Sequence, residues 1–256
     1  MPLALDECSG SLTILYDNKP HDPRLRTAWG FSCFITLNTT SILFDTGGDG
    51  RLLAENMAKL GVNISNIQVI ILSHIHRDHT GGFDAVLEAN SDITVYLPDS
   101  FPSSFKRNVE RRGVKVVEVQ KAIKVCDCAA TTGLLGFGIE EQSLLVKTQE
   151  GLIIVTGCAH PGIVNIVREA KELTGEEACL VLGGFHLASK SEKEINKIIS
   201  EMKALGVRKV APTHCSGDTA RRLFKESFGA DYIEAGVGKT LHFRRKHKSS
   251  GTPLLT

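Results

Sequence analysis

The stretch Ser73-His74-Ile75-His76-Arg77-Asp78-His79-Thr80-Gly81-Gly82 decides how this chain folds and what it can hold. It places three histidines and one aspartate, all able to ligate a metal, within six residues. The apolar run 67–72 comes directly before it and predicts a buried strand. Ligands in α/β proteins gather where strands end, so the cluster predicts a site. A solvated polar turn is the alternative, and the tight spacing of the histidines disfavours it.

The composition is typical of a globular protein. With 256 residues, 42% of them hydrophobic and 23% charged, the chain can form one large domain or two small ones. We predict one domain over residues 1–243 and a basic, flexible tail over residues 244–256. A net charge of +1 predicts neither a nucleic-acid nor a membrane partner. Residues 1–7 lack the basic start and long apolar core of a secretory signal, which predicts a cytoplasmic protein.

The cysteines predict reduced thiols. There are seven, an odd number, and they are scattered along the chain. Cys126-Asp127-Cys128 is a C-x-C pair, but no second pair accompanies it. A buried or strand-edge role is therefore favoured over a zinc site for this pair.

A pattern of strands followed by alternating strands and helices occurs twice. Thr46-Gly47 and Thr156-Gly157 lie 110 positions apart, and each follows an apolar strand and precedes a helix. At the same offset, His76 matches His186. Two similar halves predict two sheets packed face to face with helices outside. We expect strands over 12–16, 31–37, 41–45, 67–72, 94–97, 179–182 and 208–211, and helices over 50–60, 103–112, 163–173, 192–205 and 218–228.

The later histidines also follow predicted strands. His160, His186 and His214 each come after a strand end, and so does Asp45. Strand ends that converge on one edge would give a pocket of nitrogen and oxygen ligands. Such ligands suit zinc, and also iron or manganese.

These motifs resemble those of the metallo-β-lactamase superfamily over nearly the whole chain. The segments 156–166 and 182–187 are similar to the branch of 7,8-dihydropterin-6-ylmethyl-4-(β-D-ribofuranosyl)aminobenzene 5′-phosphate synthases. The resemblance implies an α/β fold, a four-layer αββα sandwich of two mixed sheets with helices outside. The residues that carry it are His74, His76, Asp78 and His79, with Asp45-Thr46-Gly47 before them and His160 and His214 after them.

The resemblance implies two divalent metal ions per chain, with zinc favoured over iron or manganese. One metal would be held by His74, His76 and His160, and the second by Asp78, His79 and His214. Asp45 would orient a ligand histidine, because a buried carboxylate on an imidazole N–H fixes its tautomer. The alternative for Asp45 is a helix N-cap or a turn residue.

One departure from the superfamily pattern affects the second metal. Members usually place a metal-bridging aspartate between the third and fourth ligand segments, but no aspartate lies between His160 and His214. Gly183-Gly184-Phe185-His186 occupies that region. His186 is a candidate ligand, a candidate general acid or substrate contact, or a structural histidine. An imidazole offers one lone pair to one metal, so the bridge would then be water or hydroxide.

The resemblance implies an enzyme that uses a metal-bound hydroxide for hydrolysis of a phosphodiester, a lactone or another ester. Asp78 would both ligate a metal and orient the attacking water. In the synthase branch, the same cations would neutralise a diphosphate leaving group while an arylamine ribofuranosyl phosphate attacks a dihydropterin. A non-catalytic metal-binding or ligand-sensing module is the alternative from another class.

The expected partner is a small-molecule substrate, which the synthase branch would make phosphorylated. Ser216 and Gly217 begin a predicted helix directly after His214 and are candidate contacts for an anion. Trp29, the only tryptophan, is a candidate to line a pocket for a flat ring or to cap the core. The oligomeric state stays open, and a homo-oligomer is compatible with the sequence.

Overall fold

The first sheet is built from short β-branched and apolar segments of the N-terminal half and one C-terminal strand. The computed structural model describes residues 2–243, so the predicted tail over 244–256 lies outside the described residues. Strands β3, β4, β5 and β6 pair in parallel, whereas β1 and β2 pair antiparallel with their neighbours. In spatial order the seven strands are β13 (Thr240–Phe243), β1 (Gly10–Tyr16), β2 (Ser32–Leu37), β3 (Thr40–Phe44), β4 (Val69–Ile71), β5 (Thr94–Pro98) and β6 (Lys115–Val119).

The second sheet contains six strands from the later part of the chain. Strands β10, β11 and β12 pair in parallel, and the remaining neighbours pair antiparallel. The spatial order is β12 (Lys209–Thr213), β11 (Ala178–Gly184), β10 (Gly151–Thr156), β9 (Leu144–Thr148), β8 (Ala129–Gly133) and β7 (Lys121–Cys126).

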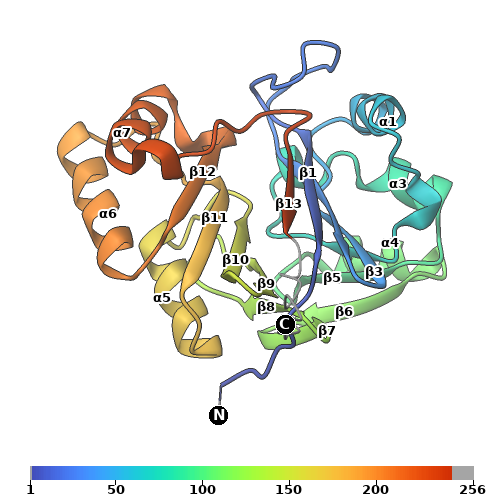
Figure 1. Ribbon diagram of the computed structural model, residues 1–256. Helices are drawn as coiled ribbons and strands as arrows, with labels where there is room; N and C mark the ends of the chain where they lie inside the picture. The colour runs from blue at the N-terminus through green and yellow to red at the C-terminus, as the bar shows by residue number, and fades with distance from the viewer. Residues whose placement is uncertain (1, 244–256) are drawn as a thin grey trace, which may run out of the picture.

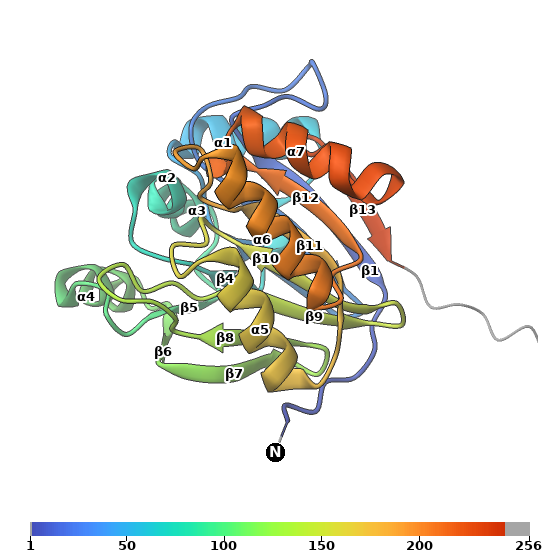
Figure 2. The same cartoon turned by 90° about the vertical axis from the view of Figure 1, so that its left-hand side faces the viewer.

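Helices cover the outer face of each sheet (Figure 1). Figure 2 looks onto α5, α6 and α7, which lie in front of the second sheet. Local signals set several helix ends: Asp49 accepts the N–H of Leu52 at the start of α1, and Ser191 begins α6 with a capping box. On the first sheet lie α1 (Gly50–Lys59), α3 (Phe83–Ala89) and α4 (Ser103–Arg111), and on the second α5 (Ile163–Thr174), α6 (Glu192–Ala204) and α7 (Asp218–Phe228).

Three apolar clusters separate these layers. The largest lies between the sheets and includes Phe44, Ile71, Val155 and Leu182, all essentially buried. A second cluster joins the second sheet to α5, α6 and α7, and a third joins the first sheet to α1, α3 and α4. Each sheet therefore buries apolar side chains on both faces. This arrangement confirms the predicted four-layer αββα sandwich of two mixed sheets.

The predicted repeat corresponds to two sets of parallel strands. Strands β3, β4 and β5 form one set, and β10, β11 and β12 form the other. The strand predicted over 67–72 is shorter than expected: β4 covers Val69–Ile71, because a 3₁₀ turn at Ile64–Asn66 precedes it. No helix within residues 2–243 is long and apolar enough to span a membrane.

Candidate metal centre

The predicted ligands all follow the carboxyl ends of parallel strands. Asp45 follows β3, His74 follows β4, and His160, His186 and His214 follow β10, β11 and β12. The two sheets meet at this edge: the backbone N–H of Gln142 donates to the carbonyl of Ser73. A Cβ on Gly157 would lie 2.2 Å from Ser73 Oγ. The close approach of these loops therefore requires glycine at position 157.

His74, His76 and His160, here called the first donor set, turn their rings toward one another. His74 Nε2 lies 3.0 Å from His76 Nδ1. The ring centroids of His160 lie 4.9 Å from His74 and 5.0 Å from His76. The Nε2 atom of His160 is buried without a hydrogen-bond partner. The ligand atoms of His74 and His160 lie within 4.8 Å of each other in a group that could hold a metal ion, and His76 meets that group through His74. The unsatisfied nitrogen of His160 also suits a cation ligand.

Asp78, His79 and His214 form the second donor set. Asp78 lies within the short helix α2 (Arg77–Thr80), and its Oδ2 atom lies 3.7 Å from Nε2 of the next residue, His79. Asp78 Oδ2 lies 3.2 Å from His214 Nε2, and His79 Nε2 lies 3.3 Å from that same nitrogen. One carboxylate oxygen and two imidazole nitrogens thus converge, together with the Cys158 sulfur, in a second group that could hold a cation.

Burial and mutual proximity favour the neutral form of two imidazoles, those of His74 and His160. Burial, and then the charge of His186, lower the pKa of His160 to about 4. The same causes, burial first and then the neighbouring histidines, lower the pKa of His74. Burial acts to raise the pKa of Asp78, but its hydrogen bond with His214 and the charge of His79 outweigh burial and lower it. His74 and His160 therefore offer neutral nitrogen lone pairs, the form that binds cations. Burial acts to lower the pKa of His79, but the charges of Asp45 and Asp78 outweigh burial and raise it.

Asp45 orients a histidine of each donor set. Its Oδ2 atom accepts from His79 Nδ1 at 2.7 Å and from Ser73 Oγ at 2.7 Å. Because the Ser73 hydroxyl has one hydrogen, it accepts from His74 Nδ1, which lies 2.8 Å away. Both histidines therefore direct Nε2 inward. The N-cap of α1 is Asp49, so the structure does not give Asp45 the alternative capping role.

Two residues that the sequence patterns did not single out hold His214. Asn18 Oδ1 lies 3.2 Å from His214 Nδ1, and its amide donates to the His214 carbonyl. This contact leaves His214 Nε2 free to face Asp78. The buried Asp17 accepts the backbone N–H of His214 at 3.2 Å. Asn18 and Asp17 lie almost 200 positions from His214, so no local pattern could identify them.

Glu141 anchors the loop that carries His160. Its Oε1 atom accepts the backbone N–H groups of residues 157, 158 and 159, at 3.1, 2.9 and 2.9 Å. Its Oε2 atom accepts the N–H of His160 at 2.9 Å. A buried carboxylate with four amide donors fixes this loop as a backbone anion nest. Glu141 lacks any local sequence signal, because its role comes from tertiary contacts alone.

Backbone strain is concentrated at the same loops. Asp45, Ala159, His186 and His214 have positive φ angles of 54°, 60°, 53° and 49°. Non-glycine residues rarely adopt this conformation, which costs about 1–3 kcal/mol at each position. Four of the five non-glycine residues with positive φ among residues 2–243 thus lie in the loops that border the centre. The strained backbone at these positions sets the direction of the side chains in those loops.

His186 lies beside the first donor set without joining it. Its ring centroid is 4.5 Å from that of His160, and its side chain is exposed. Its ring nitrogen groups instead with the sulfur atoms of Cys158 and Cys215. A cavity of about 430 Å³ adjoins it, lined by His160, His186, Phe185, Arg168, Lys190 and Glu201 among others.

The three predicted substrate contacts lie in different environments. Trp29 is 60% exposed, and its ring centroid lies 4.9 Å from that of His214, so it borders the centre and does not cap the core. Ser216 is fully buried, and its hydroxyl donates to the Thr213 carbonyl and accepts the Phe185 N–H, so a contact of its backbone N–H with an anion stays a prediction. Its hydroxyl is thus used within the fold. Gly217 is the N-cap of α7, and its contact with an anion stays a prediction.

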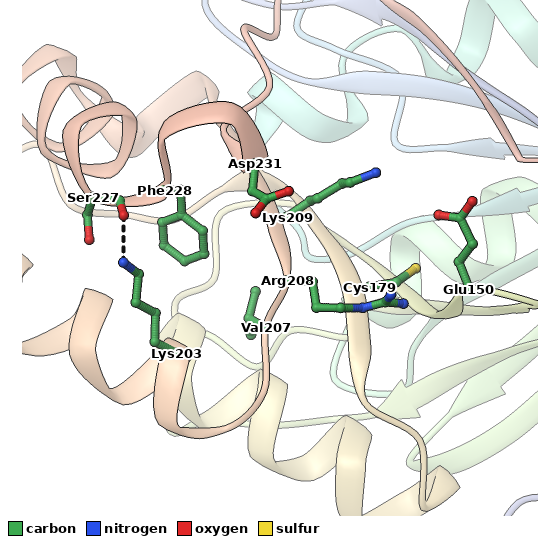
Figure 3. A pocket seen from close by; sticks show the side chains of 9 residues that line it. All are labelled: Glu150, Cys179, Lys203, Val207, Arg208, Lys209, Ser227, Phe228 and Asp231. Carbon is green, nitrogen blue, oxygen red and sulfur yellow. Dashed lines mark hydrogen bonds between the residues drawn. The ribbon is translucent and has the colours of Figure 1, made fainter.

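A separate cavity of about 420 Å³ lies near the start of β12 and includes Lys203, Arg208 and Lys209 (Figure 3). Lys203 donates to the carbonyl of Ser227 there. Strand β12 places Lys209 about 13 Å from Thr213 and the His214 loop, at ~3.3 Å per residue. None of the predicted site residues lines this cavity.

The family comparison agrees with the fold. The family model of the metallo-beta-lactamase superfamily matches residues 30–214, and the chain belongs to this superfamily. Its members bind divalent metals and include metal-dependent hydrolases.

Two relatives and one further solved structure are informative. The chain is 32% identical over 247 residues to 7,8-dihydropterin-6-methyl-4-(beta-D-ribofuranosyl)-aminobenzene-5'-phosphate synthase of Methanocaldococcus jannaschii, covering 79% of this chain and 84% of that protein. The crystal structure of Tm1679, a metal-dependent hydrolase of the β-lactamase superfamily, matches with a TM-score of 0.77 and 27% identity, over 91% of this chain and 98% of that one. YhfI from Bacillus subtilis matches with a TM-score of 0.70 and 16% identity, over 92% and 100% of the two chains, which shows the shared fold.

Proposed function

We propose that this chain is an enzyme that holds two divalent cations, one in each donor set, and acts on a small anionic substrate. The observation that carries this proposal is the convergence of ligand atoms: His74 Nε2 and His76 Nδ1 lie 3.0 Å apart, and the buried His160 Nε2 has no other partner. Lone pairs this close repel one another unless a cation gathers them. Zinc is the cation that nitrogen-rich sites of this kind favour.

Two such cations supply Lewis-acid chemistry: they acidify water to a pKa near neutral and stabilise charge that develops on a phosphoryl or carbonyl oxygen. The chain's own residues place the reactants. Asp78 uses Oδ2 toward His214, and its side chain is 22% exposed, so its second oxygen is available to orient a water. His186 lies on the open side of the first donor set, where it is placed to donate a proton to a leaving group.

The cavity beside His186 supports an anionic substrate. Arg168 and Lys190 line it with His160, His186 and Glu201, and Lys190 also pairs with Glu194 at 3.2 Å. A guanidinium and an ammonium group next to a cation site favour phosphate or carboxylate groups. Trp29 borders the centre near His214 and offers an exposed aromatic face to a flat ring.

Two reactions fit this arrangement. Identity of 32% with the M. jannaschii synthase favours a transfer reaction, in which an arylamine ribofuranosyl phosphate displaces diphosphate from a dihydropterin. Similarity to Tm1679, a metal-dependent hydrolase, favours hydrolysis of a phosphodiester or another ester. We rank transfer first because the synthase is the more similar protein in sequence.

Metal content per chain is the first test. Tag-free protein should contain about two equivalents of a divalent cation by elemental analysis. The variant H76A should lose metal, while H21A, which removes an exposed histidine away from the centre, should keep both equivalents. Wild-type protein that holds no cation after reconstitution would contradict the proposal.

Substrate panels then separate the reactions. The metal-loaded protein would be incubated with a dihydropterin diphosphate and an arylamine ribofuranosyl phosphate, and separately with phosphodiesters and lactones. Release of diphosphate that requires the amine indicates transfer, whereas turnover in water alone indicates hydrolysis. If the protein binds metal but turns over none of these substrates, and D78A gives the same result as the wild type, a binding or sensing module would be favoured.

A further inference from the structure

The sulfur atom of Cys158 lies where the two donor sets meet. Sγ lies 3.2 Å from His79 Nε2, and the side chain is 4% exposed. It groups with Asp78, His79 and His214 in one set of ligand atoms within 4.8 Å of each other, and with His74 and His160 in another. Cys158 is the residue that these two groups share.

The backbone holds this sulfur firmly in place. The N–H of Cys158 donates to Glu141 Oε1 at 2.9 Å, and both neighbouring residues donate to the same oxygen. The following residue, Ala159, has a φ angle of 60°. A side chain fixed by its loop before any ligand arrives loses little entropy when it binds one.

The neighbouring strand end has no side chain that could take this place. At Gly184, the last residue of β11, a Cβ would lie 2.4 Å from the Gly157 carbonyl oxygen and 2.7 Å from Cys215 Sγ. His186 is exposed and contacts the outer side of His160. Gly184 has no side chain, and the side chain of His186 is an imidazole. Neither residue supplies the bridging carboxylate that the superfamily usually places in this part of the chain.

We propose that the Cys158 thiolate is a ligand shared by both cations, in place of a bridging carboxylate. This inference rests on the two-cation centre proposed above. On binding, the thiol loses its proton to solvent, and the sulfur forms one bond to each cation through separate lone pairs. A sulfur ligand also selects zinc or iron over manganese, because thiolate is a soft ligand.

The alternative sulfur is that of Cys215. It groups with Cys158 and His186 but with neither donor set. Cys215 is also buried, and its thiol lies 3.6 Å from the Cys158 carbonyl oxygen. The variant C215S therefore removes a second buried thiol from the same neighbourhood and is the matched control for C158S.

Cobalt(II) is the probe, because a thiolate on cobalt gives an intense sulfur-to-metal absorption in the near ultraviolet. Metal-free wild-type protein and the variants C158S, C158D and C215S would be titrated with cobalt(II). In the wild type, this absorption should appear with the first equivalent and change again with the second. It should be lost in C158S and C158D and kept in C215S.

Affinity for the second cation should separate the two Cys158 variants. C158S should bind the second cation at least ~10-fold more weakly, the scale on which ligand support affects metal sites. C158D should keep two cations without the sulfur absorption, because its carboxylate can bridge them. Circular dichroism of each metal-free variant shows whether the fold is kept. If a variant fails to fold, the wild-type titration still overturns the inference when it gives no sulfur absorption.

Several outcomes would overturn the inference. Two bound cobalt ions without a sulfur absorption in the wild type would exclude Cys158 and leave the two-cation centre intact. Loss of the absorption in C215S and its retention in C158S would assign the ligand to Cys215. An absorption complete at the first equivalent and unchanged by the second would exclude a bridge. Wild-type protein that binds no cobalt would overturn both this inference and the proposed function.

Discussion

Asp45 accepts a hydrogen bond from Nδ1 of His79 at 2.7 Å, and neither side chain is exposed to solvent. Through Ser73, the same carboxylate oxygen also controls the tautomer of His74. One buried charge therefore orients a histidine in each donor set. The two cation sites are linked before any cation binds, and changes at Asp45 should affect both.

Substituting Asp45 with asparagine should weaken both cation sites. The amide has one oxygen, so it cannot accept from His79, the Ser73 hydroxyl and the Ser73 N–H as the carboxylate does. We expect D45N to lower zinc affinity about 10–100-fold, measured by competition with a chromophoric chelator. The control D127N changes an exposed aspartate in the β7–β8 turn and should leave affinity unchanged. Unaltered affinity in D45N would show that the carboxylate does not orient the ligands.

Removal of single ligands should empty the cation sites separately. H74A and D78A should each retain about one equivalent of metal after dialysis, because they belong to different donor sets. The double variant D78A/H214A should also retain one equivalent, since both residues serve the same cation, whereas H74A/H214A should retain none. Elemental analysis provides the measurement. Equal metal content in the two double variants would contradict the division into donor sets.

The Glu141 carboxylate should stabilise the fold as well as the centre. In E141Q, an amide nitrogen faces at least one of the four backbone donors, which leaves a buried N–H without an acceptor. We expect the free energy of unfolding in urea to fall by about 1–3 kcal/mol. The neighbouring variant E140Q is the control and should match the wild type. A wild-type unfolding free energy in E141Q would show that the loop does not depend on this carboxylate.

Asp17 should make the metal-free protein less stable as the pH rises. Burial raises the pKa of Asp17 to about 6 from an ordinary value of 3.8, and its Oδ2 atom is buried without a partner. The folded state therefore favours the protonated form. Its stabilising contribution is complete below pH 4 and is lost as the pH rises through 6. A shift of roughly two units corresponds to about 3 kcal/mol.

The variant D17N isolates this contribution. Urea unfolding of the metal-free proteins between pH 4 and pH 7.5 should show D17N gaining stability relative to the wild type by up to about 3 kcal/mol. D92N, which changes an exposed aspartate, should show no such trend. A difference between D17N and wild type that is constant with pH would contradict the effect.

The fold and the gathering of ligand residues at one edge follow from local sequence patterns, whereas the division into two donor sets came from the resemblance to the superfamily. The histidines and Asp78 lie directly after apolar strands, and parallel strands bring their carboxyl ends to one edge. Ser73 and Cys158 lie inside the sequence motifs 73–82 and 156–166. Their polar side chains at these positions could have identified them as residues of the centre. The Ser216 hydroxyl is used by two backbone groups, so the predicted anion contact there depends on the backbone N–H and stays a prediction.

The supporting residues could not be predicted from the sequence in the same way. Asn18 and Glu141 lie in loops distant in sequence from the residues they hold. All four Glu141 contacts at this loop, and one of the two Asn18 contacts with His214, are to backbone groups that any sequence supplies. Their importance depends on the packing of the sheets and on the exclusion of water. The spacing of residues along the chain records neither the packing of the sheets nor the exclusion of water.

The crowding at Gly184 limits how this centre can change during evolution. An aspartate there would require the Gly157 backbone and the Cys215 side chain to move first. A single substitution therefore cannot install a carboxylate at this strand end while the present loop conformation is retained. Lineages that carry a carboxylate at this strand end and lineages that carry Cys158 should be separated by several linked substitutions, with Gly184, Cys215 and Cys158 changing together.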